Sequence, residues 1–172
     1  MNKTFKIAYM GLLGAAAVAL SFLEGLLPPL PFLPPGAKAG FSNVITMFAA
    51  SHLGLGATLT LCLMKSLFVL LTRGFTAFCM SLCGGLLSAL VAYLCLQKKQ
   101  SLLLTGIFGA ITHNTAQLLV AMAITQTPYL FFYSPVLLIF AIISGSITGV
   151  LLGAIYKSLC HLEKQFSPKG ES

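Results

Sequence analysis

The sequence predicts an all-α integral membrane protein with about six transmembrane helices in a single domain, residues 1–172. Of its 172 residues, 58% are hydrophobic and 8% are charged, whereas soluble domains carry roughly 25% charged residues. Apolar runs of about 17 to 25 residues recur along the chain, and each is long enough to cross a bilayer. The stretches best suited to water are a proline-rich loop at about 24–38 and a tail at about 158–172, so no separate soluble domain is expected.

Six spans follow from these runs, with boundaries set by charged residues and by Gly or Pro: 5–26, 39–54, 56–72, 75–96, 101–126 and 132–157. The first run continues to about Leu23 without a small-residue cleavage site, so we interpret it as a retained span rather than a signal peptide. The turn Gly54-Leu-Gly56 is so short that the spans on either side of it must be antiparallel neighbours.

The basic residues predict that both termini lie in the cytoplasm. A net charge of +7 would suggest nucleic acid as a partner of a soluble protein, but here the basic residues lie at span ends, where they indicate topology, and no nucleic acid is expected. With the N-terminus inside, Lys38 and Arg73 fall outside, and seven lysines fall inside: Lys3, Lys6, Lys98, Lys99, Lys157, Lys164 and Lys169. This orientation puts the proline-rich loop and an aromatic turn at 126–135 together on the outer face.

The stretch from Glu24 to Asn43 forms a stiff elbow between the first two spans. Proline fixes φ, lacks a backbone donor and pushes its predecessor toward extended geometry, so the elbow cannot continue a helix. Glu24, Lys38 and Asn43 are polar groups placed where two apolar segments meet, and such groups at membrane depth indicate a functional site. A rigid connector whose charges mark the water interface is the alternative.

Polar groups also fall within the later spans. Lys65 lies about two turns from either end of the third span, where an unpaired ammonium is costly, so it must reach the interface, pair or face a polar cavity. His113 and Gln117 are four residues apart and share a face of the fifth span, with Asn114 adjacent. These three side chains either line a site or make structural hydrogen bonds.

The predicted topology directs these polar groups toward the outer side. The fifth span runs outward, so Gln117 lies outward of His113 and the polar patch points toward the elbow. We therefore predict a substrate-binding cavity that opens to the outside and is roofed by the elbow. Its predicted lining is Glu24, Lys38, Asn43, Lys65, Arg73, His113, Asn114 and Gln117.

Small residues recur at helical spacing in two spans. Gly11, Ala15 and Ala19 lie four apart in the first span, where they predict a docking face for a partner helix, with intramolecular packing as the alternative. A second close-packing face is expected in the last span, at Gly145, Gly149 and Gly153.

The motifs of several enzyme classes are missing from the sequence. There is no aspartate, and prenyl synthases bind magnesium through paired Asp-rich motifs because a hard cation on phosphate needs several carboxylate oxygens. The chain has no GxxxxGK[ST] loop for ATP and no GxSxG elbow. The five cysteines are predicted to be buried free thiols, and Cys79 and Cys83 lack further ligands for a metal. We expect binding and translocation rather than catalysis, with no metal and no cofactor.

Three stretches resemble a bacterial membrane family: Pro34-Pro-Gly-Ala-Lys-Ala-Gly-Phe-Ser-Asn43-Val-Ile-Thr46, the charged third span ending at Arg73, and Gly109-Ala-Ile-Thr-His113-Asn114-Thr-Ala-Gln117. The family is heptaprenyl diphosphate synthase component I, also called the Gx transporter family, and the resemblance runs from about Lys6 to Tyr156. It implies a multi-pass protein of the bacterial cell membrane. The family is similar in size, span number and topology to the S-components of energy-coupling factor (ECF) vitamin transporters. That similarity implies a ligand near the outer face under loops, a first helix that meets a coupling subunit through small residues, and partner ATPases.

The leading hypothesis is a membrane-embedded substrate-binding or transport subunit that recognises a small anionic molecule from the outer side. Its basis is the excess of Lys38, Lys65 and Arg73 over Glu24 in the predicted cavity. One alternative is a non-catalytic accessory subunit in isoprenoid or quinone metabolism (heptaprenyl diphosphate, menaquinone), partnered by a prenyl synthase. A further alternative is a role in a flavin or quinone redox pathway.

Overall fold

The structure, a computed structural model, describes residues 3–26 and 40–166. Within these ranges the chain folds into helices without strands, which confirms the all-α prediction. The α-helices are joined by short turns and by one 3-10 helix, η1, in the order α1 (Lys3–Leu26), α2 (Ser42–His52), α3 (Leu55–Arg73), α4 (Phe75–Gln97), α5 (Leu102–Thr125), η1 (Pro128–Tyr133) and α6 (Ser134–Phe166).

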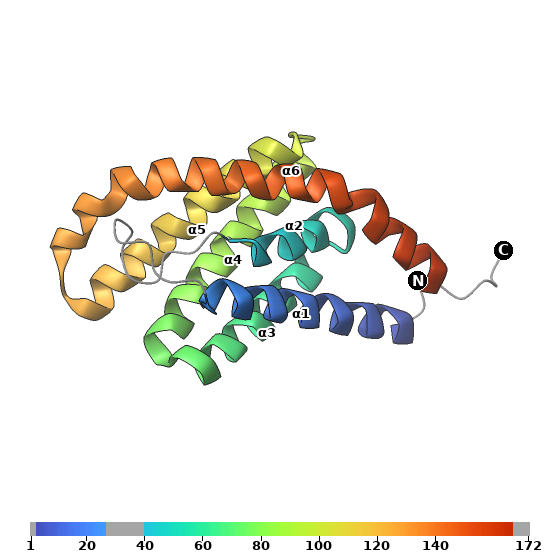
Figure 1. Ribbon diagram of the computed structural model, residues 1–172, viewed down its shortest axis with the longest axis horizontal. Helices are drawn as coiled ribbons and strands as arrows, with labels where there is room; N and C mark the ends of the chain where they lie inside the picture. Colours follow the sequence, from blue (N-terminus) through green and yellow to red (C-terminus); the bar gives the residue numbers. More distant parts are fainter. Residues whose placement is uncertain (1–2, 27–39, 167–172) are drawn as a thin grey trace.

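The helices run back and forth along one elongated bundle (Figure 1). α1 begins and α6 ends at the same end of the bundle, where the Tyr9 hydroxyl donates a hydrogen bond of 3.3 Å to the Leu159 carbonyl. The end of α1, the α3–α4 turn and η1 gather at the opposite end (Figure 1). This alternation suits a chain that crosses a membrane repeatedly. The last described helix, α6, runs to Phe166, beyond the predicted boundary at 157.

In residues 3–26 and 40–166, five helices are long and apolar enough to cross a membrane, which confirms a multi-pass membrane protein. The exception is α2, whose 11 residues extend about 16 Å, roughly half the thickness of a hydrocarbon core. The predicted span at 39–54 is therefore represented, in the described part of the chain, by a short helix rather than by one that crosses the bilayer alone.

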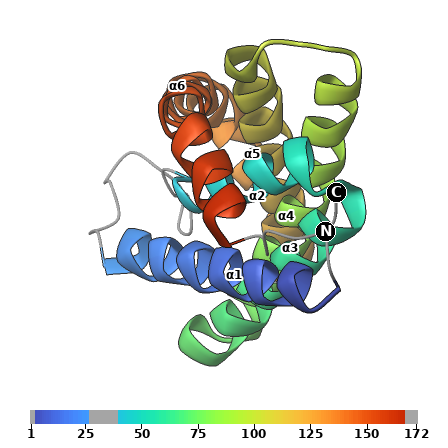
Figure 2. The same ribbon diagram turned by 90° about the vertical axis from the view of Figure 1, so that its right-hand side faces the viewer.

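The core of the bundle forms around α2. Eight of its 11 residues are buried, and α1, α3, α4 and α6 all contact it. The end-on view shows α2 enclosed among its neighbours (Figure 2). Phe48 of α2 is fully buried and packs edge-on against Tyr156 of α6, with ring centroids 5.6 Å apart. α2 thus fills the middle of the molecule and positions its N-terminal residues between α1 and α3.

Two glycines make the tight connections around α3. Gly54 precedes α3 with φ +84°, and Gly74 joins α3 to α4 with φ +85°. Residues with a Cβ rarely adopt this left-handed region, whereas glycine enters it at little cost. The α2–α3 connection therefore needs only two residues and the α3–α4 connection only one, so neighbouring helices reverse direction at once.

Glycines also allow α5 and α6 to touch through their backbones. A Cβ on Gly145 would lie 2.6 Å from the carbonyl oxygen of Gly106, and one on Gly149 would lie 2.6 Å from that of Leu102. By contrast, a Cβ on Gly153 would meet nothing within 4 Å. The predicted close-packing face thus exists at Gly145 and Gly149 but does not extend to Gly153.

Candidate functional site

A buried carboxylate from α1 holds the start of α2. Glu24 lies in the last turn of α1 and accepts two hydrogen bonds from Ser42, the backbone N–H at 3.1 Å and the hydroxyl at 3.4 Å. The first N–H groups of a helix lack partners within it, and its positive dipole end favours an anion. The residue before α2, Phe41, supplies no side-chain cap. Glu24 therefore caps α2 from a different helix.

Lys65 of α3 approaches the same point from the other side. Its side chain is 3% exposed, and its Nζ donates to Asn43 Oδ1 at 2.9 Å and to the Ser42 hydroxyl at 3.4 Å. The Ser42 hydroxyl thus lies between Glu24 and Lys65. A buried charge is tolerated when it is hydrogen-bonded and balanced, and this network supplies both conditions for the two charges.

A small cavity of about 60 Å³, which we call the polar cavity, lies beside this network. Six of the eight predicted site residues line it: Glu24, Asn43, Lys65, Arg73, His113 and Gln117. The remaining lining residues were not predicted: Ser21, Gly40, Ser42, Val69, Ala77, Met80 and Ser81. Side chains from α1, α2, α3, α4 and α5 therefore meet at one place.

Arg73 differs from the two buried charges. It is the last residue of α3, is exposed, and makes no hydrogen bond or ion pair with any other residue in the described ranges. Its guanidinium lies directly against Gly25 of α1, where any side chain would collide with it. Arg73 is thus a cation at the edge of the polar cavity whose charge no described neighbour balances.

The predicted site residues of α5 differ in whether they line the polar cavity. His113 lines the polar cavity, as does Gln117 one turn later. Asn114 does not line it; its side chain is 6% exposed, and within residues 3–26 and 40–166 its Nδ2 has no hydrogen-bond partner. Lys38, the other predicted site residue missing from the cavity wall, lies outside the described residues.

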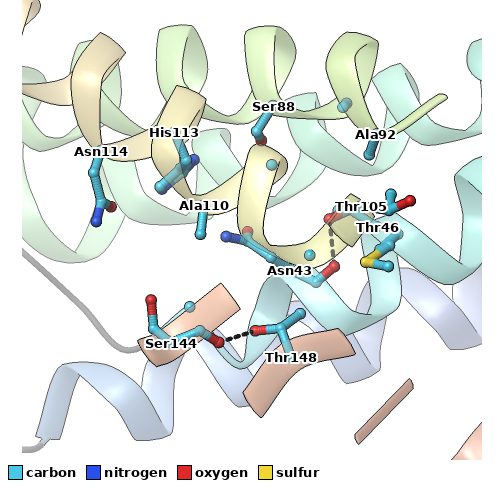
Figure 3. A pocket seen from close by; sticks show the side chains of 15 residues that line it. Asn43, Thr46, Ser88, Ala92, Thr105, Ala110, His113, Asn114, Ser144 and Thr148 are labelled. Atoms are coloured by element: carbon cyan, nitrogen blue, oxygen red, sulfur yellow. Dashed lines mark hydrogen bonds between the residues drawn. The ribbon is translucent and has the colours of Figure 1, made fainter. Parts of the chain in front are cut away.

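A second polar space, of about 30 Å³, lies deeper in the bundle (Figure 3). Its hydroxyl groups bond mainly to carbonyls of their own helices: Thr46 donates to Asn43 at 3.0 Å, and Thr148 donates to Ser144 at 2.9 Å. The space has room for about one water molecule. It is too small for a substrate, and the side chains around it serve to pack the helices together.

A larger hollow, the apolar chamber, lies between α4, α5, η1 and α6. Its volume is about 270 Å³. It is lined by Thr76, Met80, Asn114, Gln117, Leu118, Ala121, Thr125, Thr127, Leu130 and Leu137. Most of these residues were not predicted, because apolar side chains in a membrane helix carry no signal that separates a chamber wall from lipid contact. Ser42, in the wall of the polar cavity, could have been found from the sequence, since serine is a preferred residue at helix starts.

The predicted partner face lies on the outside of α1. Gly11, Ala15 and Ala19 are all exposed, whereas Leu13 and Ala17 between them are buried in the core. Within the described part of the chain, the small residues therefore do not pack against other helices and are open to lipid or to a partner helix.

The described residues offer little for metal or thiol chemistry. They contain no group of three or more His, Cys, Asp or Glu side chains that could hold a metal ion. The five cysteines are free thiols, as predicted, although only Cys62 is buried. Its Sγ donates to the Gly85 carbonyl at 3.4 Å, which makes it part of the α3–α4 contact.

Known proteins resemble this chain in sequence and in fold. The sequence model of the family described as heptaprenyl diphosphate synthase component I matches residues 13–155. No curated protein matches the sequence. The fold is similar to a solved structure described as the structure and mechanism of the S component of a bacterial ECF transporter, with a TM-score of 0.71 and 22% sequence identity. The match covers 94% of this chain and 98% of that chain, which confirms the S-component-like fold.

Proposed function

We propose a function from two premises: the chain belongs to the heptaprenyl diphosphate synthase component I family, and its fold resembles that of an ECF transporter S component. The proposed function is that of a non-catalytic membrane subunit that binds a small anionic substrate from the outer face for transport. The observation that carries it is the convergence of six predicted polar residues from four helices on one cavity. Polar residues within membrane helices are costly, and they gather where a substrate passes or binds.

The charge balance of the polar cavity favours an anion. Glu24 and Lys65 offset one another through Ser42, so their charges add little net potential. Arg73 remains without a described counter-charge. A guanidinium presents several N–H donors in a planar fork and is well suited to a carboxylate or phosphate. The substrate is therefore proposed to place its negative group at Arg73, with Asn43, His113 and Gln117 as further polar contacts.

The proposed entry route is from the outer side. The positive-inside rule assigns the termini to the cytoplasm, and the polar cavity includes the end of α1 and the end of α3, which lie away from the termini (Figure 1). Lys38, on the elbow, is proposed to contribute a further positive charge above the cavity.

Partner subunits are proposed to supply the energy for transport. The chain has no ATP-binding GxxxxGK[ST] loop, and the structure that it resembles is one component of an ECF transporter. The exposed face formed by Gly11, Ala15 and Ala19 is the proposed contact with a coupling subunit, because small residues let membrane helices approach closely.

Replacement of Arg73 by Gln tests the proposed substrate site. We expect the wild-type protein, extracted gently from its host membrane, to retain a small anion that native mass spectrometry detects, and Arg73→Gln to lose it. Arg73 makes no hydrogen bond within the described chain, so the variant should fold normally. Lys98→Gln, which removes an exposed charge from the α4–α5 turn, is the matched control and should retain the anion. Equal retention by both variants would contradict the proposal.

The family description favours a second candidate, an accessory subunit in isoprenoid or quinone metabolism. The same mass spectra separate the two functions. Co-purification of an Asp-rich prenyl synthase or a long isoprenoid, without ATPase subunits, would favour the accessory role. ATPases together with a membrane coupling subunit would favour transport.

A further inference from the structure

We infer that the substrate is amphiphilic: a small anionic head lies in the polar cavity, and an apolar body joined to it fills the apolar chamber. This inference rests on the proposed function and adds the substrate class to it. It assigns a role to the apolar chamber of about 270 Å³, which a small anion bound in the polar cavity would not occupy.

The two spaces are adjacent. Met80 of α4 and Gln117 of α5 line both of them. Gly84 lets α4 pack closely on this part of α5, because a Cβ there would lie 3.0 Å from both Gln117 Cγ and His113 Nδ1. The side chains of Met80 and Gln117 stand between the two spaces, and the substrate is proposed to extend past them from the polar cavity into the apolar chamber.

The polar cavity alone is small. Its volume is about 60 Å³, which suits a carboxylate or a similar head group and little more. The apolar chamber is nearly twice the size of an apolar cavity of ~150 Å³ that binds benzene. It therefore has room for a body of about two fused rings.

The walls of the chamber match an apolar body. Leu118 and Ala121 of α5 face Leu130 of η1 and Leu137 of α6 across it. Burial of apolar surface against such side chains contributes to affinity in proportion to the area removed from water. A groove between α5 and α6, of about 340 Å³, shares Leu118 and Leu137 with the chamber and gives a longer body room to continue.

One polar atom in the chamber wall offers the body a hydrogen-bond donor. Asn114 lines both the chamber and the second polar space and is more than nine-tenths buried, yet its Nδ2 lacks a hydrogen-bond partner among the described residues. Buried donors are nearly always satisfied. A carbonyl or ring nitrogen on the apolar body would accept this hydrogen bond and set the orientation of the ligand.

Three probes of matched chemistry test the inference: 2-naphthoate with head and body, acetate with the head alone, and 2-naphthol with an uncharged body. Binding is measured by equilibrium dialysis of the full-length protein in lipid nanodiscs, with empty nanodiscs subtracted. We expect 2-naphthoate to bind at least about tenfold more tightly than either other probe. Acetate binding as tight as 2-naphthoate would overturn the amphiphile inference and leave an anion site in place. Failure of both anions to bind would contradict the proposed function itself.

A bulky side chain in the chamber provides a second test. Ala121→Trp should weaken 2-naphthoate binding about tenfold or more and leave acetate binding unchanged. Ala123→Trp, on the exposed side of the same helix, is the control and should bind both probes as the wild type does. Equal 2-naphthoate affinity in the two variants would place the body elsewhere. If Ala121→Trp does not fold, the comparison of the three probes on the wild type still decides the inference.

Discussion

Ser42 allows two opposite charges to sit inside the bundle without direct contact. Its hydroxyl donates to Glu24 and accepts from Lys65, while its backbone N–H donates to Glu24. The start of α2 is thereby attached to both α1 and α3. Arg73 has no comparable structural contact within the described chain. At the scale of single residues, the buried charges stabilise the fold around the cavity, and the exposed one is proposed to bind the ligand.

This division predicts that Glu24→Gln is mainly a stability variant. The amide keeps the size of the side chain but removes the negative charge near Lys65 and the start of α2. We expect the free energy of unfolding to fall by about 1–3 kcal/mol, measured by equilibrium unfolding in mixed micelles of detergent and SDS.

A double-variant cycle isolates the effect of the charge. Glu24→Gln combined with Lys65→Met should cost less than the sum of the two single variants, because the charge that each leaves unbalanced is then absent. Lys98→Gln, at an exposed position, should leave stability unchanged. Strict additivity in the cycle would show that Glu24 and Lys65 act independently.

At the scale of elements, the backbone contact between α5 and α6 positions one wall of the apolar chamber. Gly106 and Gly145 lie so close that a Cβ on either would overlap the other's backbone. Asn114 and Leu118, farther along α5, contribute to the chamber together with Leu137 of α6. The separation of these two helices therefore depends on glycines distant from the chamber itself.

Gly145→Ala tests this contact. The added methyl group would lie 2.6 Å from the Gly106 carbonyl oxygen, so the helices must separate, and we expect a loss of about 1–3 kcal/mol of stability. Gly153→Ala makes the same change two turns later on α6 where a Cβ meets nothing within 4 Å, and it should be neutral or slightly stabilising. The stabilities of the two variants are compared by thermal unfolding in the same detergent. Equal losses of stability would argue against a specific backbone contact between α5 and α6.

At the scale of the whole molecule, α1 separates two surfaces. Its buried side packs on the core through Tyr9, Leu13 and Ala17, and its other side exposes the small residues Gly11, Ala15 and Ala19. Substrate binding and partner binding are thus proposed for different faces of one bundle. A change on the outer face of α1 should affect assembly alone.

Ala15→Leu is expected to remove the partner subunits without loss of the ligand. A larger side chain prevents the close approach of another helix, so co-purification of a coupling subunit and ATPases from host membranes should be lost. Ala154→Leu, an equally exposed position on α6, is the control and should keep them. Native mass spectrometry detects the partner subunits and the ligand in one sample. Retention of all partners by Ala15→Leu would exclude this face of α1 as the contact.

The sequence predicted the helices well because charged residues and glycines interrupt the apolar runs. Gly54 and Gly74 occupy turns that need a positive φ, and their positions in the sequence indicated both turns. His113 and Gln117 were predicted to share a face because they are four residues apart, and they do line one cavity. Polar residues in a membrane helix are few, so each one constrains how the helix is rotated.

Two features were not predictable on these grounds. Asn114 follows His113, but successive residues of a helix are turned by about 100°, and Asn114 lines the second polar space and the apolar chamber but not the polar cavity. α2 has the composition of a membrane span although other helices surround it. Lipid tails and a protein interior are about equally apolar, so composition alone does not distinguish a helix that faces lipid from one that is enclosed.

The enclosure of α2 also has a consequence for biogenesis. A helix of 11 residues is too short to be threaded across the bilayer alone, and most of its side chains find their contacts only on other helices. Glu24 and Lys65 meet their shared partner Ser42 only once α2 lies between α1 and α3. The buried contacts of α2 can therefore form only after α1 and α3 are both in place beside it.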